Sequence, residues 1–270
     1  MNGGDKLKLY LDPGHGGDDP GAVGNGLKEK DITLDIAKRI RNILINNYRN
    51  IEIKMSRTGD TTKSLTERTN EAKRWKADYY VSIHCNAVNG NASGYEDYIH
   101  SGLNHTSETA KYRDMLHKEI TKVNGLRNRG KKKANFHVLR ETNMSAFLSE
   151  NGFISNSADA LKMMKSSWRQ KVAQGHANGI AQAFNLPRKV NKYPDMLYKV
   201  IAGSFESKEN AEERVKVLRS KGIDAYILRE TISGELWYRV QAGAFASREN
   251  AESQMRVIER AAIDVFIFEE

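Results

Sequence analysis

The sequence predicts an α/β fold, a mainly parallel sheet with helices on both faces, followed by a small ferredoxin-like α+β domain made of two βαβ repeats. Two observations predict this: strand-like segments alternate with amphipathic helical segments in the first part of the chain, and the last part repeats itself. Pro187 and Pro194 bound a polar stretch without apolar periodicity, which is typical of a linker. We therefore expect domains over 1–187 and 198–270, joined by a linker over 188–197.

The elements of the first domain are predicted by apolar spacing. Three segments carry strand-like patterns: 6–11, 51–55 and 79–83. Two helical patterns follow the first two of these strands: an apolar stripe of Ile32, Ile36, Ile40, Ile43 and Leu44, and residues 65–75. Ser64 and Glu67 form a capping-box pattern before the second helix. This alternation implies a mainly parallel sheet covered on both faces.

The second domain is predicted by an internal repeat. Residues 198–228 and 238–268 align at an offset of 40 residues, with 14 of 31 positions identical. Each unit begins with an alternating strand pattern, continues through Gly and Phe to a Ser that would cap a helix, and closes with a second strand. Two such βαβ units make a ferredoxin-like sandwich. A dimerisation module or a solubility cap is the alternative role for the repeats.

Charge is distributed unevenly along the chain. The whole chain has a net charge of +9, but residues 198–270 hold 11 basic and 13 acidic residues. Residues 1–197 therefore carry a net charge of +11, which favours a polyanionic partner such as nucleic acid, an anionic membrane or an anionic cell wall.

Targeting and redox signals are few. No apolar run approaches the ~20 residues of a membrane span. The first residues lack the basic-then-apolar pattern of a signal peptide, so synthesis in the cytoplasm is expected. The single cysteine, Cys85, excludes an intramolecular disulfide and is expected to be a small buried residue.

Two histidines follow predicted strands. His15 lies in a glycine-rich turn and His84 ends a strand, and ligands of parallel sheets bind beyond the carboxyl ends of the strands. With Glu29 at the start of a helix, they form a zinc-type ligand set that leaves a fourth position for water. On residue types alone the alternative stays open: a turn residue, a first-turn acid and a core histidine.

Glu150 interrupts the short apolar run of residues 146–156. A carboxylate among apolar neighbours has a raised pKa, which suits a general base or acid. The alternative is a strand end with an outward-facing glutamate.

Six sequence blocks appear in order along the chain: Asp12 to Gly17, Asp19 to Ala22 with Gly26-Leu27-x-Glu29, Ser56-Arg57-Thr58, Leu65-x-x-Arg68-x-x-x-Ala72, Ser82-Ile83-His84-x-Asn86, and Glu150-x-Gly152 to Asn156. Together they resemble the zinc-dependent N-acetylmuramoyl-L-alanine amidases of the Amidase_3 type, over residues 5–186. The repeats resemble the SPOR domain, a peptidoglycan-binding module. The combination looks like sporulation mother-cell wall hydrolases and related phage endolysins of Bacillus-like hosts.

The resemblance implies a function. Residues 1–187 would be a zinc amidase that cuts the amide bond between N-acetylmuramic acid and L-alanine in peptidoglycan with a zinc-activated water. Its Zn²⁺ ligands map onto His15, Glu29 and His84, and its catalytic glutamate maps onto Glu150. The SPOR-like repeats would tether the enzyme to the wall, which it would reach after release by lysis or a holin-type route.

Further residues are candidates for binding. We expect His137, Asn86 and Arg68 to contact substrate, and Phe205 and Phe245 to contact the wall. The cationic run within 125–133 is expected to be a solvated loop that could also hold anionic wall polymers or stem-peptide carboxylates.

Three other functions are alternatives. A zinc peptidase that cuts stem or cross-bridge peptides would use the same ligand set. A wall-binding protein with a dead catalytic domain would not need all four candidate residues. A nucleic-acid partner is not expected, because no motif supports it and the cationic run lacks interleaved aromatic residues.

Overall fold

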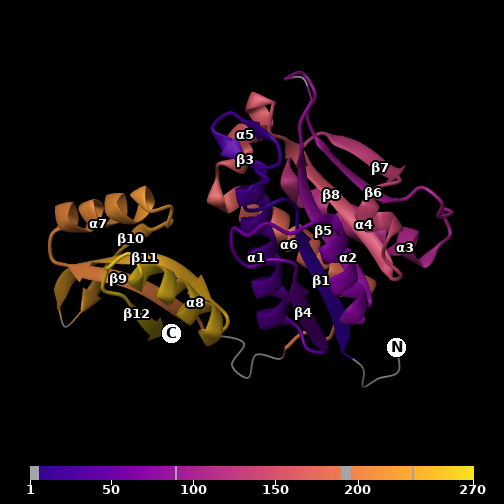
Figure 1. Cartoon of the computed structure of the whole chain (residues 1–270). Coiled ribbons are helices and arrows are strands. Elements are labelled where there is room, and N and C mark those ends of the chain that lie inside the picture. Colours follow the sequence, from indigo (N-terminus) through magenta and orange to yellow (C-terminus); the bar gives the residue numbers. More distant parts are fainter. Residues whose placement is uncertain (1–5, 89, 190–195, 233) are drawn as a thin grey trace. The chain divides into compact units, whose positions relative to one another are not determined.

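The computed structural model describes residues 6–88, 90–189, 196–232 and 234–270. These residues form two compact units, one ending at Lys189 and one made of the described residues that follow it (Figure 1). Most of the predicted linker, residues 190–195, and the start of the chain, residues 1–5, lie outside the described residues. None of the described helices combines the length and the apolar character that crossing a membrane requires.

The first unit contains eight strands and six helices within its described residues. The strands are β1 (Leu7–Pro13), β2 (Val23–Gly24), β3 (Leu27–Lys28), β4 (Ile51–Met55), β5 (Tyr79–Asn86), β6 (Tyr95–His100), β7 (Asn128–Ala134) and β8 (Ser145–Phe153). The helices are α1 (Glu29–Asn47), α2 (Leu65–Arg74), α3 (Glu108–Asn124), α4 (His137–Arg140), α5 (Ser157–Met163) and α6 (Ser166–Ala183).

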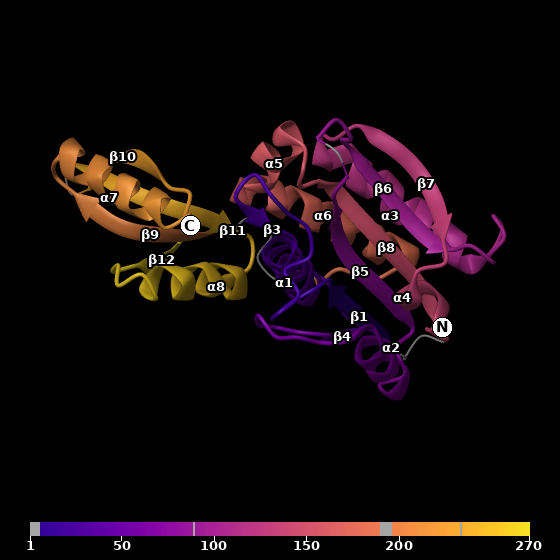
Figure 2. The ribbon, with the colours of Figure 1, turned by 45° about the horizontal axis from the view of Figure 1, so that its top comes forward.

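The main sheet has the strand order β4-β1-β5-β8-β6-β7 (Figure 2). The first four strands in this order run parallel, and β6 pairs antiparallel with β8 and parallel with β7. The mainly parallel sheet is thus confirmed. The expectation of a solvated loop in the cationic run is wrong, because residues 128–134 form the edge strand β7.

Helices cover both faces of this sheet, as expected. Along β1, Leu9 and Leu11 face the core beneath α1, α3 and α6, whereas Tyr10 faces a smaller core beneath α2 and α4. The predicted apolar stripe of α1 is buried throughout. The predicted capping box of α2 is also present, because the Ser64 and Glu67 side chains each accept the other's backbone N–H.

The second unit is an antiparallel sheet with the order β10-β11-β9-β12 and two helices. Its elements are β9 (Tyr198–Phe205), α7 (Lys208–Ser220), β10 (Tyr226–Ile232), β11 (Glu235–Phe245), α8 (Arg248–Glu259) and β12 (Phe266–Glu269). Both predicted βαβ repeats are present, and their strands interleave within one sheet. Ser207 caps α7 through its side chain, but Ser247 makes no such bond at α8.

Helices α3 and α6 approach each other closely at Gly179, where an added Cβ would lie 2.6 Å from the Leu116 Cα. We expect Gly179→Ala to lower the free energy of unfolding by about 1–3 kcal/mol, because the helices must separate. Calorimetric unfolding of the full chain measures the change. Gly59→Ala is the control, since no atom lies within 4 Å of its added Cβ. Equal stability of the two variants would contradict this packing.

Candidate metal centre and active site

The turn after β1 presents His15. The residue has φ 61°, in the left-handed region, and it is followed by Gly16 with φ 130°. A Cβ at Gly14 would lie 2.2 Å from the His84 ring. Glycine at this position therefore lets the turn approach the end of β5, so that the two imidazoles meet edge to face with centroids 5.0 Å apart.

Two arginines fix the backbone of this turn. Arg68 is 2% exposed, and its guanidinium donates to Asp12 Oδ1 (2.7 Å), the Pro13 carbonyl (2.9 Å) and the His15 carbonyl (2.8 Å). Arg57 Nε also donates to the Pro13 carbonyl. Burial would raise the pKa of Asp12, but the charge of Arg68 outweighs it and lowers the pKa. We expected Arg68 to contact substrate, and the structure instead places it beneath the turn.

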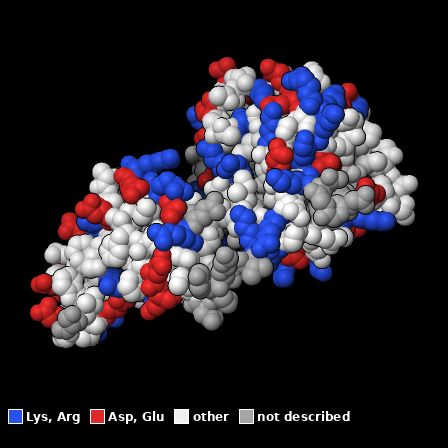
Figure 3. Space-filling model, turned by 90° about the horizontal axis from the view of Figure 1, so that it is seen from below, with Lys and Arg blue, Asp and Glu red and all other residues white. Residues whose placement is uncertain are grey.

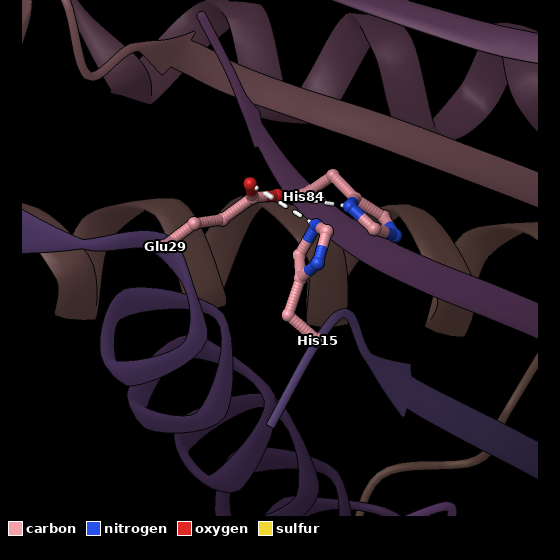
Figure 4. Close-up of side chains that lie close together, drawn as sticks. All are labelled: His15, Glu29 and His84. Atoms are coloured by element: carbon pink, nitrogen blue, oxygen red, sulfur yellow. Dashed lines mark hydrogen bonds and ion pairs between the residues drawn. The ribbon is translucent and has the colours of Figure 1, made fainter. Parts of the chain in front are cut away.

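The carboxylate of Glu29, the first residue of α1, contacts both histidines (Figure 4). Its Oε2 is 3.1 Å from His15 Nε2, and its Oε1 is 2.9 Å from His84 Nδ1. The backbone N–H groups of Ala22 and Cys85 donate to the same two oxygens. The carboxylate is only 3% exposed, so backbone and side-chain contacts together fix its orientation. Cys85 itself faces the opposite, apolar side of the sheet, as expected.

The protonation of this cluster follows from its contacts. Burial would raise the pKa of Glu29, but hydrogen bonds with both histidines lower it far below its usual range. Burial would lower the pKa of His15, but Glu29 and Asp19 outweigh it and raise the pKa. Asp19 Oδ2 lies 2.8 Å from His15 Nδ1, an orienting contact that leaves Nε2 for the cluster. Asp19 belongs to a motif block, yet no role was predicted for it.

The donor set fits zinc. The ligand atoms of His15, Glu29 and His84 all lie within 4.8 Å of one another. Within the described ranges, no other group of three or more His, Cys, Asp or Glu residues comes together in this way. Two imidazoles and one carboxylate are a ligand set of catalytic zinc sites, and the carboxylate–histidine contact at Asp19 is the outer support that such sites use. The convergence favours the ligand interpretation over three separate structural roles.

Glu150 lies beside the cluster. It pairs in register with His84 on the neighbouring strand, so both side chains face the same side of the sheet. Although the residue is partly exposed, its Oε2 is buried and has no hydrogen-bond partner within the described part of the chain. Burial and the charges of Glu29 and Glu96 raise its pKa well above the usual value.

Glu96 on β6, which the sequence analysis missed, connects several polar side chains. It is 2% exposed and accepts hydrogen bonds from Asn86 Nδ2 (3.0 Å), Tyr98 Oη (2.6 Å), Arg129 Nε (2.7 Å) and Lys132 Nζ (2.5 Å). Burial would raise its pKa, but these contacts lower it. Asn86, predicted to bind substrate, is thus held at the end of β5 on the same face as the cluster. Glu96 follows a glycine-containing loop, and no local motif marked it.

The remaining predicted residues lie on elements that carry none of the three ligand candidates. His137 begins α4, and its Nε2 is buried without a hydrogen-bond partner in the described part of the chain. Phe205 and Phe245 are partly buried against the core of the second unit. Each ring lies against the glycine two residues earlier in the chain. An added Cβ would come within 2.7 Å of the Phe205 ring at Gly203 and within 2.5 Å of the Phe245 ring at Gly243. This close packing explains why both repeats carry Gly-x-Phe.

Comparisons with known proteins agree with this geometry. Residues 9–182 match the family model of the N-acetylmuramoyl-L-alanine amidases, Amidase_3, and residues 196–269 match the SPOR domain. The solved structure of the catalytic domain of CwlV, an N-acetylmuramoyl-L-alanine amidase from Bacillus (Paenibacillus) polymyxa var. colistinus, matches with a TM-score of 0.63 and 33% identity. The match covers 67% of this chain and 99% of that chain.

Two relatives that match over 222 residues extend the likeness beyond the first unit. N-acetylmuramoyl-L-alanine amidase CwlM of Bacillus licheniformis is 50% identical over 222 residues, 82% of this chain and 85% of that protein. The sporulation-specific N-acetylmuramoyl-L-alanine amidase of Bacillus subtilis (strain 168) is 46% identical over 222 residues, 82% and 84% of the two chains. The endolysin of Bacillus phage SPP1 is 42% identical over 184 residues, 67% of each. The predicted resemblance is confirmed: the chain belongs to the Amidase_3 family of N-acetylmuramoyl-L-alanine amidases and carries a SPOR domain.

Proposed function

We propose that this amidase hydrolyses the bond between N-acetylmuramic acid and L-alanine as a zinc enzyme, with His15, Glu29 and His84 as ligands and Glu150 as the proton acceptor. The observation that carries the proposal is the convergence of the three ligand atoms within 4.8 Å, next to Glu150 on the adjoining strand. The overall test is end-group analysis of digested peptidoglycan, with and without a chelator. New L-alanine amino termini support the amidase, and termini of another stem residue would indicate a peptidase.

The roles of the residues follow from their positions. Zinc held there would supply a Lewis acid for the amide carbonyl, would lower the pKa of a water to about 7, and would counter the acidic neighbours that raise the pKa of Glu150. Glu150 Oε2, which has no partner in the described part of the chain, accepts the proton of the attacking water and returns it to the leaving amine. Asp19 holds the His15 ring, and Arg68 holds the His15 backbone.

We also propose that the SPOR domain tethers the enzyme to peptidoglycan, with Phe205 and Phe245 contributing to the contact. Tethering raises the local concentration of substrate. The positive charge of residues 1–197 supports a further attraction to anionic wall polymers. On the face in Figure 3, Lys and Arg side chains recur across the larger unit. Release by lysis or a holin-type route stays a prediction.

Glu150→Gln removes the proton acceptor without changing the side-chain volume. We expect it to retain zinc and to lower kcat for release of L-alanine termini by ~10²–10⁴-fold. Metal analysis and end-group kinetics on the same preparation measure both. Glu52→Gln, a change at an exposed residue of β4, is the control. Activity of Glu150→Gln within tenfold of the wild type would exclude this role.

His84→Ala removes one ligand of the proposed zinc site. We expect a loss of stoichiometric zinc and of activity, because two remaining ligands hold the metal weakly. Elemental analysis after dialysis measures the zinc content, and His105→Ala, at an exposed position, should keep it. A His84→Ala protein with a full complement of zinc would contradict the assignment.

Deletion of residues 198–270 should weaken co-sedimentation with purified walls. Hydrolysis of a soluble muramoyl peptide should be unchanged, because the ligand cluster and Glu150 lie in the first unit. Unchanged sedimentation of the shortened chain would refute the tether.

A further inference from the structure

The edge strand β7 places two basic side chains on the same face of the sheet. Between two successive paired positions, β6 advances by two residues but β7 advances by three. The longer stretch of β7 contains Gly130, whose φ is 89°. This bulge places Arg129 and Lys132, three residues apart, on the same face of the sheet. Lys131 points elsewhere and pairs with Asp114 of α3. Without the bulge, strand alternation would put Arg129 and Lys132 on opposite faces.

Both basic groups converge on the buried carboxylate of Glu96. Arg129 Nε and Lys132 Nζ reach the same oxygen, Oε2, at 2.7 and 2.5 Å. Two cations facing one carboxylate leave one positive charge in excess. The Glu96 side chain is 3% exposed, whereas those of Arg129 and Lys132 are 29% and 37% exposed, so the excess charge is open to solvent.

Donors remain available on both cations. Arg129 uses Nε for Glu96 and Nη1 for the Ser93 carbonyl. Lys132 Nζ has three N–H bonds and contacts Glu96 through one of them. The Lys132 ammonium also lies 5.8 Å from the centre of the Tyr98 ring, which restricts where it can move. The pair is thus positioned in advance to receive an anion.

This charge lies close to the proposed catalytic residue. Glu96 pairs in register with Glu150, which in turn pairs with His84, so the three form one row across β6, β8 and β5. Neighbouring strands are about 4.8 Å apart, which places the Glu96 contacts one strand from Glu150. An anion bound there would therefore lie one strand away from the residue proposed to act on the scissile bond.

We propose that Arg129 and Lys132, oriented by Glu96, bind the first carboxylate of the stem peptide after L-alanine, the α-carboxylate of D-glutamate. The inference rests on the proposed function, because it places the peptide on the β6–β7 side of the scissile amide. Charge-assisted hydrogen bonds of this kind are strong and directional. The site would therefore discriminate a free carboxylate from its amide.

The test uses two synthetic muramoyl tripeptides that differ only at this group, with D-glutamate in one and D-isoglutamine in the other. We expect the wild type to prefer the carboxylate in kcat/KM. Arg129→Gln and Lys132→Gln should each lower kcat/KM for the carboxylate substrate by about tenfold or more, with little change for the amide. The preference should collapse in both variants, while zinc content stays unchanged.

Lys131→Gln is the matched control, because it removes the same charge from the same strand but on the other side. An equal loss in this control would show general charge attraction, as to anionic polymers, and would overturn the subsite. Equal losses on both substrates in Arg129→Gln and Lys132→Gln would also overturn it. If the wild type releases L-alanine termini from neither tripeptide nor from walls, the proposed function fails first, and the subsite fails with it.

Discussion

The pairing of β8 with β5 on one side and with β6 on the other is the constraint on which the site depends. This register sets His84, Glu150 and Glu96 in one row. A slip of one residue would turn Glu150 to the face covered by α1, α3 and α6, where an unpaired carboxylate is strongly unfavourable. Packing of β8 opposes the slip, because Phe147 fills the larger core and Leu148 fills the smaller one, and a shift would exchange them. Packing in the interior thereby fixes the positions of the site residues at the strand ends.

Local patterns predicted the elements whose cause is local. The stripe of α1 and the cap at Ser64 depend on residues within a short segment, and both are present. The two repeats are also present, but they were predicted from their self-similarity, because their strands pair between the repeats. The resemblance linked His15, Glu29 and His84, which their wide spacing alone could not do. Arg68 could not be placed from sequence, because its burial depends on partners more than 50 residues away.

The basic run of β7 could not be predicted as a strand from local sequence patterns. Five of its seven residues are polar and it has no apolar alternation, so its sequence resembles that of a solvated loop. It becomes a strand because β6 offers a free edge, and β6 lies there because of its own pairing with β8. Glu96 was overlooked for the same reason: its partners come from three different strands, and only the folded sheet brings them together.

The composition of β7 has a second consequence, for the behaviour of the molecule in a crowded solution. It is the last strand of its sheet, and an open strand edge can template pairing with another chain and seed aggregates. Closely spaced lysines and a bulge are two devices that block such docking. This edge carries both, since Lys131, Lys132 and Lys133 follow the kink at Gly130. A chain with a neutral, unkinked β7 would lose solubility before it lost its fold.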